Sequence, residues 1–539
     1  MARYTAPRMI DAFGDWAQMR ADFHWQIPEF FNIADACCDV WAAADPARQA
    51  LQHVGENGRG ESWSYGALKI ASDQLASAFA ARGLKRGDRV AVLLGQGPEV
   101  LITHFAAMKL GAVVLPLFTL FGPDALAYRL ADSGARIAVT DRANLDKLAS
   151  LRADLPDLSE VYVVGGAPEP YRDFHGEIRA AAPLAAPVRT RADDAALMVY
   201  TSGTTGAPKG VLHAHRVLLG HLPAIELHHE GFPQPGDKGW TPADWAWVGG
   251  LLDLALPCLY YGVPLVSHRM RKFDPEAAYG LIARHQIRNL FMPPTALKLM
   301  QGTPVPASVH LRTIGSGGES LGADLLDWGR SALNVAINEL YGQTECNLVL
   351  TSAAAFMQVR PGSMGLAVPG HDVAVIDAEG RTLGPGEVGE IAVKRPDPVM
   401  FLRYWNQPEK TAEKFTGDWL RTGDLATRDA DGYFTFVARD DDVITSAGYR
   451  IGPSEIEHCL TSHADVAMAA VVGVPDPLRT EVVKAVVVTR EGASRDGLAE
   501  ALIQLVRARI SPHVAPRIVE FADTLPMTAT GKIKRRELR

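Results

Sequence analysis

Cysteine is scarce in this chain, with only five residues among 539. No two of them form a C-x-x-C pair, and their positions do not have the spacing of metal ligands. The odd number and the scatter argue against a disulfide framework and a zinc ribbon, and they indicate ordinary thiols in a reducing compartment. The five are Cys37, Cys38, Cys258, Cys346 and Cys459.

A secretory signal, a membrane span and an excess of basic charge are missing as well. The first residues, 1–5, lack the apolar core of a signal peptide. The longest apolar stretch, residues 104–121, is broken by a lysine, a glycine and a proline, so no membrane span is expected. Asp and Glu outnumber Lys and Arg by 62 to 54, and this net charge of -8 argues against a general nucleic-acid binder. We therefore expect a cytoplasmic protein.

Short apolar runs separated by helical patterns are plentiful. Residues 89–94 and 112–117 are two such runs, and a helical pattern over 98–110 lies between them. Strand, helix and strand at this spacing predict a βαβ unit in a parallel sheet. Similar runs recur at residues 136–140, 161–164, 196–200 and 311–314.

The pattern changes at residues 429–442, where five aspartates fall within fourteen positions. After this break the chain predicts a small α+β domain of about 100 residues, a common domain size. The predicted fold class is therefore α/β, with a large N-terminal body of several subdomains (residues 1–440) and a small C-terminal domain (residues 441–539). The expected elements of the small domain are helices at 453–460 and 497–510 and strands at 469–474, 483–488 and 517–521.

The strongest local signal is the segment YTSGTTGAPKG, residues 200–210, at the end of an apolar strand. Its glycines expose backbone N–H groups, its hydroxyls add donors, and Lys209 adds a positive charge, so the loop can enclose a polyphosphate. The order of a Walker A loop is absent, which disfavours a P-loop ATPase. A flexible Ser/Gly linker is also disfavoured, because linkers rarely follow a buried strand.

This segment resembles the phosphate loop of the adenylate-forming superfamily, which includes acyl-CoA synthetases, luciferases and the adenylation domains of peptide synthetases. Six further motifs resemble that family in the family's own order, and the order is what makes the resemblance specific. They are GGE at 317–319, LYGQTE at 340–345, WLRTGD at 419–424, RDDD at 439–442, SAGYR at 446–450 and TGK at 530–532. The resemblance is closest to the short- and medium-chain acyl-CoA synthetases.

The resemblance implies a two-step ligase. ATP and a carboxylic acid form an acyl-adenylate and pyrophosphate, and coenzyme A then takes the acyl group and releases AMP. ATP, Mg²⁺ and coenzyme A are the implied cofactors, and a small carboxylic acid is the implied partner. The implied nucleotide-binding residues are Thr201, Ser202, Gly203, Thr204, Thr205, Gly206, Lys209, Gly318, Glu319, Tyr341, Asp424, Arg439 and Arg450.

Lys532, Thr344 and Glu345 are the residues that the resemblance implies for catalysis, with Glu345 also as the Mg²⁺ ligand. A carboxylate suits this hard ion, and Asp424 can accept hydrogen bonds from both ribose hydroxyls. Negative charge builds up where the carboxylate attacks the α-phosphate, so a cation at Lys532 acts selectively on the transition state. A catalytically dead binding protein is disfavoured because Lys532, Glu345 and Asp424 are all present.

The resemblance also implies that the small C-terminal domain is mobile. It delivers Lys532 for adenylation and then rotates about a hinge at Asp441 to bring Gly448 beside the thiol tunnel. A glycine fits that lining because the missing side chain leaves room for the pantetheine arm. Ala438 and Met527 depart from the family pattern, but neither change removes a charged catalytic group.

The resemblance defines the identity of the carboxylic acid less narrowly than the reaction. The implied acyl pocket comprises Trp247, Val248, Gly249 and Gly342. Relatives restricted to acetate carry a tryptophan at the place of Gly342, so we expect a deeper pocket and a short- to medium-chain fatty acid or a related small acid. A benzoate-type aryl acid, a carrier protein in trans instead of free coenzyme A, and a luciferase-like monooxygenase remain alternatives. The sequence does not decide between a monomer and a homodimer.

Overall fold

We analysed a computed structural model of the chain. It describes residues 4–201, 207–318, 321–439, 442–446, 449–476, 480–510, 512, 514–528 and 532–539. The chain divides into two compact units. The first contains residues 1–361, 365–372 and 394–415, and the second contains residues 362–364, 373–393 and 416–539.

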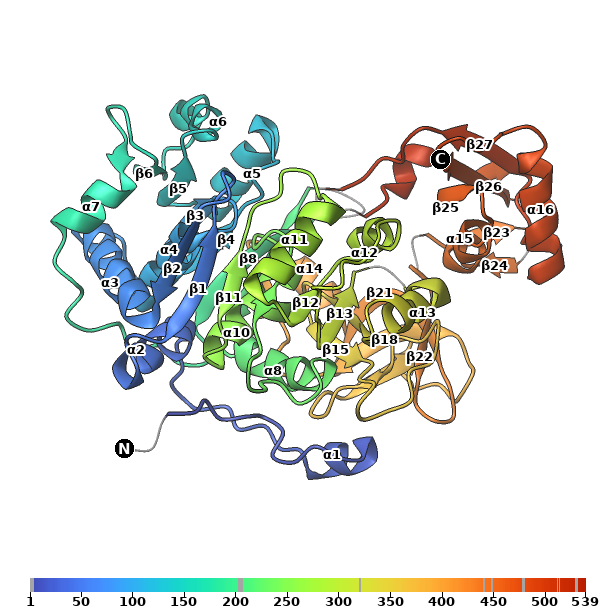
Figure 1. The fold of residues 1–539 in the computed structure, drawn as a ribbon, viewed down its shortest axis with the longest axis horizontal. Helices are drawn as coiled ribbons and strands as arrows, with labels where there is room; N and C mark the ends of the chain where they lie inside the picture. Colours follow the sequence, from blue (N-terminus) through green and yellow to red (C-terminus); the bar gives the residue numbers. More distant parts are fainter. Residues whose placement is uncertain are drawn as a thin grey trace. The chain divides into compact units, whose positions relative to one another are not determined.

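A nine-stranded mixed sheet runs through the first unit (Figure 1). Six consecutive strands, β1, β11, β10, β12, β13 and β14, are parallel to one another, whereas β15, β16 and β2 pair antiparallel with their neighbours. In sheet order the strands are β16 (Leu366–Ala367), β15 (Asn347–Thr351), β14 (Ile337–Gln343), β13 (Thr313–Gly317), β12 (Asn289–Phe291), β10 (Gly239–Trp240), β11 (Leu265–Ser267), β1 (Gln49–Val54) and β2 (Gly60–Ser64).

An eight-stranded sheet forms the other half of the first unit. Alternate residues of its strand β3 pack in two different hydrophobic cores. Val90 and Val92 pack in one core, and Ala91 and Leu93 pack in the other. Apolar residues on both faces are typical of a parallel sheet that is buried on both sides. In sheet order the strands are β19 (Arg403–Tyr404), β9 (Lys209–Ala214), β8 (Ala195–Thr201), β4 (Val113–Pro116), β3 (Arg89–Leu93), β5 (Ile137–Asp141), β6 (Glu160–Val164) and β7 (Arg172–Asp173).

Helices fill the space around these sheets. Helix α4 begins with a proline in its first turn, after Gly97, and is buried along almost its whole length. It packs on α3 and on the strands β3 and β4 (Figure 1). The α-helices of the first unit are α1 (Trp16–Asp22), α2 (Val40–Ala44), α3 (Tyr65–Ala81), α4 (Pro98–Lys109), α5 (Pro123–Ser133), α6 (Leu145–Ala149), α7 (Phe174–Ala180), α8 (Val217–His228), α9 (Val248–Gly250), α10 (Leu256–Tyr260), α11 (Pro275–His285), α12 (Pro294–Gln301), α13 (Ala323–Ala332) and α14 (Pro408–Glu413).

Three short helical segments of other types complete the first unit. Two are π-helices that run directly into α-helices: η1 (Asp35–Asp39) leads into α2, and η3 (Leu251–Ala255) joins α9 to α10. The third is the 3-10 helix η2 (Arg152–Asp154).

The second unit contains two five-stranded sheets. Helices α15 (Pro453–Thr461) and α16 (Leu498–Arg509) share one apolar core with the second of these sheets. The chain ends in the 3-10 helix η4 (Arg535–Leu538). The first sheet contains β17 (Val373–Ile376), β18 (Gly389–Lys394), β21 (Trp419–Arg428), β20 (Phe415–Thr416) and β22 (Phe434–Arg439), and the second contains β24 (Tyr449–Ile451), β23 (Ile444–Ser446), β26 (Thr480–Thr489), β25 (Val466–Asp476) and β27 (Ile518–Ala522).

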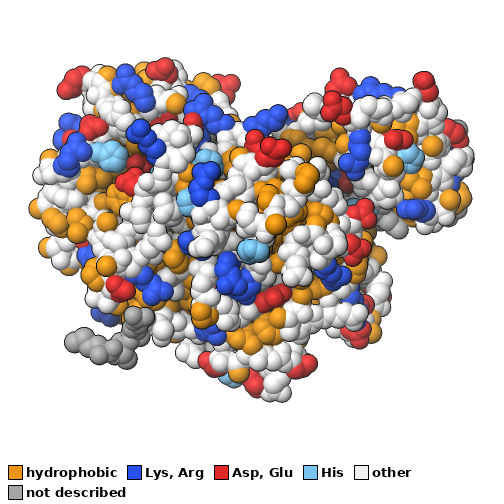
Figure 2. Space-filling view, viewed as in Figure 1, with side chains coloured by type: hydrophobic (Ala, Val, Ile, Leu, Met, Phe, Trp, Pro, Cys, Tyr) orange, Lys and Arg blue, Asp and Glu red, His pale blue; other side chains and the backbone are white. Residues whose placement is uncertain are grey.

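The predicted α/β fold class is confirmed, and so is the βαβ unit, because β3 and β4 are parallel neighbours joined by α4. The two units are defined by packing, whereas the boundary predicted at residues 440 and 441 concerns movement and stays a prediction. Within the described ranges, no helix is long and apolar enough to span a bilayer. In the view of Figure 2, Lys and Arg side chains are interspersed with Asp and Glu.

Candidate functional site

The carboxyl edge of the nine-stranded sheet gathers several of the predicted site residues. Trp247 follows β10, Gly318 follows β13, and Tyr341 lies near the end of β14. The register of β13 and β14 pairs Gly317 with Leu340, which brings the predicted adenine-side residues to adjacent strand ends. Ligands of open α/β sheets bind at this edge.

The indole of Trp247 forms a wall at this edge. Its ring centroid is 5.5 Å from that of Phe291, the last residue of β12, and a Cβ added to Gly318 would lie 3.3 Å from the indole. Gly318 has a φ of +97°, which favours glycine. Gly249 also lies against this wall, because a Cβ there would come within 2.9 Å of the Trp247 ring and 3.0 Å of Phe291. Residues 247–249 and 318 therefore lie together, as the predicted acyl pocket and adenine turn require.

The chain around Trp247 has irregular backbone. Val248 begins the short helix α9, which continues directly into the π-helix η3. A π-helical turn inside a helix often marks a functional site. Asp244 is half-buried just before this segment, and its carboxyl group accepts a hydrogen bond from the Ala246 amide at 2.9 Å. Burial raises the pKa of Asp244 to about 6.

The structure gives a steric reason for glycine at position 342 that the sequence prediction did not include. A Cβ added there would lie 1.5 Å from the carbonyl oxygen of Asn347 and 2.3 Å from its carbonyl carbon. Glycine is therefore required where β14 and β15 approach each other, next to an irregularity in their register. In this geometry the backbone of Asn347 occupies the space beside the Gly342 Cα. A role of Gly342 in acyl length stays a prediction.

Lys209 and Glu345 meet on either side of one tyrosine. Lys209 begins β9 after the phosphate-loop segment, and its Nζ lies 4.8 Å from the ring centroid of Tyr404. The Tyr404 hydroxyl donates to Oε1 of Glu345 at 2.5 Å. Thr344 precedes Glu345 in the turn between β14 and β15 and is half-buried. Three of the predicted phosphate and metal residues are thus close together.

The electrostatics of this group suit a polyanion. Burial lowers the pKa of Lys209, the carboxylate of Glu345 opposes that shift, and Lys414 and Lys410 add to it. The ammonium group of Lys414 donates to Oε1 of Gln343 at 3.4 Å, beside Thr344 and Glu345. Glu413 is also part of this group, because its carboxylate accepts from the Lys410 ammonium at 2.7 Å. Lys209, Lys410 and Lys414 outnumber the carboxylates of Glu345 and Glu413, and this excess of positive charge favours a phosphate ligand.

Glu345 fits the implied Mg²⁺ in chemistry and burial. In the described part of the chain no three His, Cys, Asp or Glu side chains gather into a metal cage. Mg²⁺ does not need such a cage, because it usually takes one or two carboxylates together with waters and substrate phosphates. Glu345 is only 9% exposed, and its carboxylate oxygens are the hard ligands that Mg²⁺ prefers.

In the second unit, Asp424 and Arg439 lie opposite each other on β21 and β22. The Arg439 Nε is 3.7 Å from Oδ1 of Asp424, and the Asp424 amide donates to the Thr422 hydroxyl at 3.1 Å. Gly423, between Thr422 and Asp424 in the sequence, has a φ of +79°. Its amide donates to the carboxylate of Glu390 at 2.6 Å. The paired strands therefore hold the Asp424 carboxylate beside a permanent cation, as the ribose-binding prediction requires.

Lys532 is joined to Thr528 by two hydrogen bonds near the end of the chain. Its amide donates to the Thr528 hydroxyl at 3.0 Å, and its carbonyl accepts from the Thr528 amide at 2.7 Å. Met527 and Ile533 form the adjoining bridge. The side chain of Lys532 is exposed.

Several predicted site residues lie outside the described part of the chain. For Arg450 only the backbone is described; it belongs to β24 and pairs with Thr445. The residues outside the description are Ser202, Gly203, Thr204, Thr205, Gly206, Glu319, Asp441 and Gly448.

Comparison with known proteins decides the family. Residues 38–405 match the family described as AMP-binding enzyme, and residues 455–532 match the AMP-binding enzyme C-terminal domain. The chain belongs to the AMP-binding enzyme family. The predicted resemblance to adenylate-forming enzymes is thereby confirmed.

Similar proteins cover this AMP-binding enzyme almost from end to end. The mitochondrial acyl-coenzyme A synthetase ACSM2 of Rattus norvegicus is 34% identical, over 96% of this chain and 92% of its own length. The acetyl-coenzyme A synthetase of Bacillus subtilis is 33% identical, over 97% and 93%. The crystal structure of a benzoate CoA ligase from Burkholderia xenovorans is 28% identical and superposes with a TM-score of 0.83, covering 94% of this chain and all of that one.

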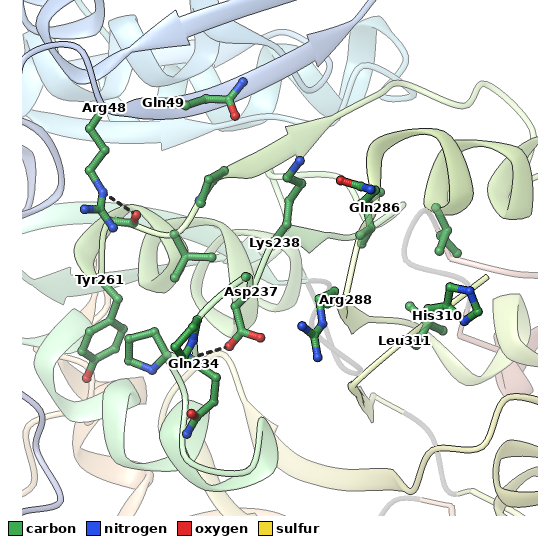
Figure 3. Close-up of a pocket in the computed structure, with 18 of the residues that line it drawn as sticks. Arg48, Gln49, Gln234, Asp237, Lys238, Tyr261, Gln286, Arg288, His310 and Leu311 are labelled. Carbon is green, nitrogen blue, oxygen red and sulfur yellow. Dashed lines mark hydrogen bonds between the residues drawn. The ribbon is translucent and has the colours of Figure 1, made fainter. Parts of the chain in front are cut away.

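A large cavity of this AMP-binding enzyme lies at the opposite edge of the sheet. It has a volume of about 1080 Å³ and includes Lys238, Arg288 and Leu311 in its lining. These residues precede β10, β12 and β13, so the cavity opens at the amino ends of the strands (Figure 3). It is therefore separate from the residues that the family motifs select.

Sequence reasoning missed Tyr404 as a member of the site. Its only local signal is the aromatic pair Tyr404-Trp405 before an Asn-Gln-Pro turn. Its contact with Glu345 comes from the pairing of β19 with β9, a long-range feature that no local pattern indicates.

Proposed function

We propose that this AMP-binding enzyme is an AMP-forming acyl-CoA synthetase, which activates a carboxylic acid with ATP and transfers the acyl group to coenzyme A. The observation that carries the proposal is the meeting of Lys209 and Glu345 at Tyr404. This arrangement supplies a cation for the polyphosphate and a carboxylate for its metal at one place, directly after the phosphate-loop strand.

The proposed ATP-binding residues are those that the sequence motifs select. The loop from Thr201 to Gly206 and Lys209 bind the phosphates, where backbone and hydroxyl donors converge. Gly318, Glu319 and Tyr341 bind the adenine, and Asp424 accepts hydrogen bonds from the ribose hydroxyls with Arg439 beside it.

Adenylation joins two negatively charged reactants, so charge compensation is its main requirement. Lys209 acts on the polyphosphate, Thr344 donates to a phosphate oxygen, and Lys532 acts where charge develops between the attacking and bridging oxygens. Mg²⁺ held by Glu345 would neutralise further phosphate charge and stabilise the leaving pyrophosphate.

Thioester formation is assigned to a second arrangement of the C-terminal domain, residues 441–539. Asp441 acts as the hinge, and Gly448 lines the path of the pantetheine thiol, with Arg450 beside the nucleotide. Free coenzyme A is the proposed acyl acceptor. Assays with free coenzyme A and with the phosphopantetheine thiol of a carrier protein distinguish this acceptor from a carrier protein in trans. The proposed compartment is the cytoplasm.

The proposed acid is a short- to medium-chain fatty acid, bound against Trp247, Val248 and Gly249. An aryl acid is the second candidate, favoured by the wall that Trp247 and Phe291 form, because two aromatic rings suit a flat substrate. Similarity to a benzoate CoA ligase also supports this candidate.

The direct test is AMP release with coenzyme A across acetate, butyrate, hexanoate, octanoate and benzoate. A single-peaked profile at four to eight carbons supports the first candidate, and preference for benzoate supports the second. If no acid stimulates AMP release above the acid-free rate, the proposed function is wrong.

A further inference from the structure

Tyr404 is a buried polar side chain beside the proposed metal ligand. The residue is 1% exposed, and its hydroxyl donates to Oε1 of Glu345 at 2.5 Å. A hydrogen bond to a carboxylate is stronger than a neutral one and fixes the direction of the carboxylate plane. One oxygen of Glu345 is therefore oriented by Tyr404.

The backbone holds this tyrosine rigidly. Tyr404 pairs with Val211 of β9, and its amide donates to the Thr411 hydroxyl at 3.0 Å. The segment also binds Glu345 through its main chain, because the Phe401 amide donates to the Glu345 carbonyl at 2.9 Å. Two contacts, one from the side chain and one from the backbone, thus tie Glu345 to residues 401–404.

The ring of Tyr404 also serves the phosphate side. The Lys209 ammonium lies 4.8 Å from the ring centroid, within the range of a cation–π contact. Tyr404 therefore touches both a proposed phosphate-binding residue and the proposed metal ligand, through different parts of its side chain.

We propose that Tyr404 is a positioning residue for the metal–nucleotide site: its hydroxyl holds the Glu345 carboxylate in the orientation that accepts Mg²⁺, and its ring holds Lys209 toward the phosphates. The inference rests on the proposed function. Tyr404 acts through Glu345 and Lys209 and does not itself contact the reacting atoms. Groups that orient a metal ligand typically contribute about 10–100-fold to metal affinity or activity.

A second buried tyrosine offers a matched control. The Tyr261 hydroxyl donates to a carboxylate oxygen of Glu226, and these residues are 3% and 0% exposed. Tyr261 lines the cavity at the amino ends of the strands, away from the motif residues. Tyr404→Phe and Tyr261→Phe therefore delete the same atom from the same kind of pair, one beside the proposed metal ligand and one remote from it.

The first readout is equilibrium binding of ATP by calorimetry without any acid, once with Mg²⁺ and once with EDTA. We expect Tyr404→Phe to lower the affinity for Mg²⁺-ATP about tenfold or more and to leave metal-free ATP binding unchanged, because the ring remains. Tyr261→Phe should bind both forms as the wild type does. The inference is overturned if Tyr404→Phe keeps the wild-type affinity for Mg²⁺-ATP, or if both variants lose it equally.

The second readout separates positioning from an independent structural effect. In a Glu345→Gln background the Tyr404→Phe change should have little further effect on Mg²⁺-ATP binding, since the hydroxyl acts through the carboxylate. Full additivity of the two changes would contradict the inference. Thioester formation from supplied acyl-adenylate should be unchanged in Tyr404→Phe, whereas equal slowing of both half-reactions would also count against it.

The failure of this inference is distinguishable from failure of the proposed function. If wild-type protein forms no acyl-adenylate from any acid, the proposed function fails first. If the wild type does form one and Tyr404→Phe behaves as Tyr261→Phe does, only the positioning role fails.

Discussion

Replacing Gly342 with alanine tests the geometry of the hairpin that carries Tyr341, Thr344 and Glu345. The added Cβ would lie 1.5 Å from the Asn347 carbonyl oxygen. Nonbonded atoms pack about 3.5–4.0 Å apart, so the two strands must separate by roughly 2 Å. The obstacle is backbone rather than a flexible side chain, so we expect a cost at or above the usual overpacking range of about 1–3 kcal/mol.

The consequence for activity is a uniform loss. Because the displaced hairpin carries the proposed nucleotide and metal residues, Gly342→Ala should slow adenylation of acetate, hexanoate and benzoate by the same factor. The assay is acid-dependent ATP–pyrophosphate exchange on each acid, with a melting curve. Gly280→Ala is the control, because a Cβ at that position of α11 meets nothing within 4 Å. A Gly342→Ala protein with native melting and an altered chain-length profile would refute the steric argument.

Three further predictions concern charge. Lys532→Ala should slow acyl-adenylate formation by about 10²–10³-fold and spare thioester formation from supplied acyl-adenylate, which single-turnover assays of each half-reaction check. Asp424→Ala should raise the KM for ATP about tenfold or more through the lost ribose contacts, measured by initial rates with Asp424→Asn alongside. Burial raises the pKa of Glu226 from 4.5 to about 7, so the folded state holds this proton more tightly than the unfolded state. The free energy of unfolding should therefore fall by about 3 kcal/mol between pH 4.5 and 7, and Glu226→Gln should flatten that slope in urea titrations.

Much of the fold follows from local patterns. The predicted helix at 98–110 and strand at 161–164 correspond to α4 and β6, because buried apolar runs and a helix-starting proline are local signals. The strand predicted at 469–474 is longer in the structure, Val466–Asp476, since its ends are set by pairing with β26 rather than by hydrophobicity.

The site was less predictable where it depends on distant contacts. The glycine at 342 is explained by the approach of the Asn347 backbone, which requires knowing how β14 and β15 pair. Tyr404 joins Glu345 only because β19 adds to β9. Ordered motifs identify the family and its polar residues, whereas close backbone approaches and supporting side chains emerge only from the folded chain.

The central claim is that this chain activates a carboxylic acid as its adenylate. The most direct measurement is a reaction of wild-type protein with radiolabelled ATP, Mg²⁺ and hexanoate or benzoate without coenzyme A, followed by separation of the nucleotides. The account predicts an acid-dependent acyl-AMP that remains with the protein and yields AMP and acyl-CoA once coenzyme A is added. Release of ADP, or AMP formation that does not depend on the acid, would contradict it.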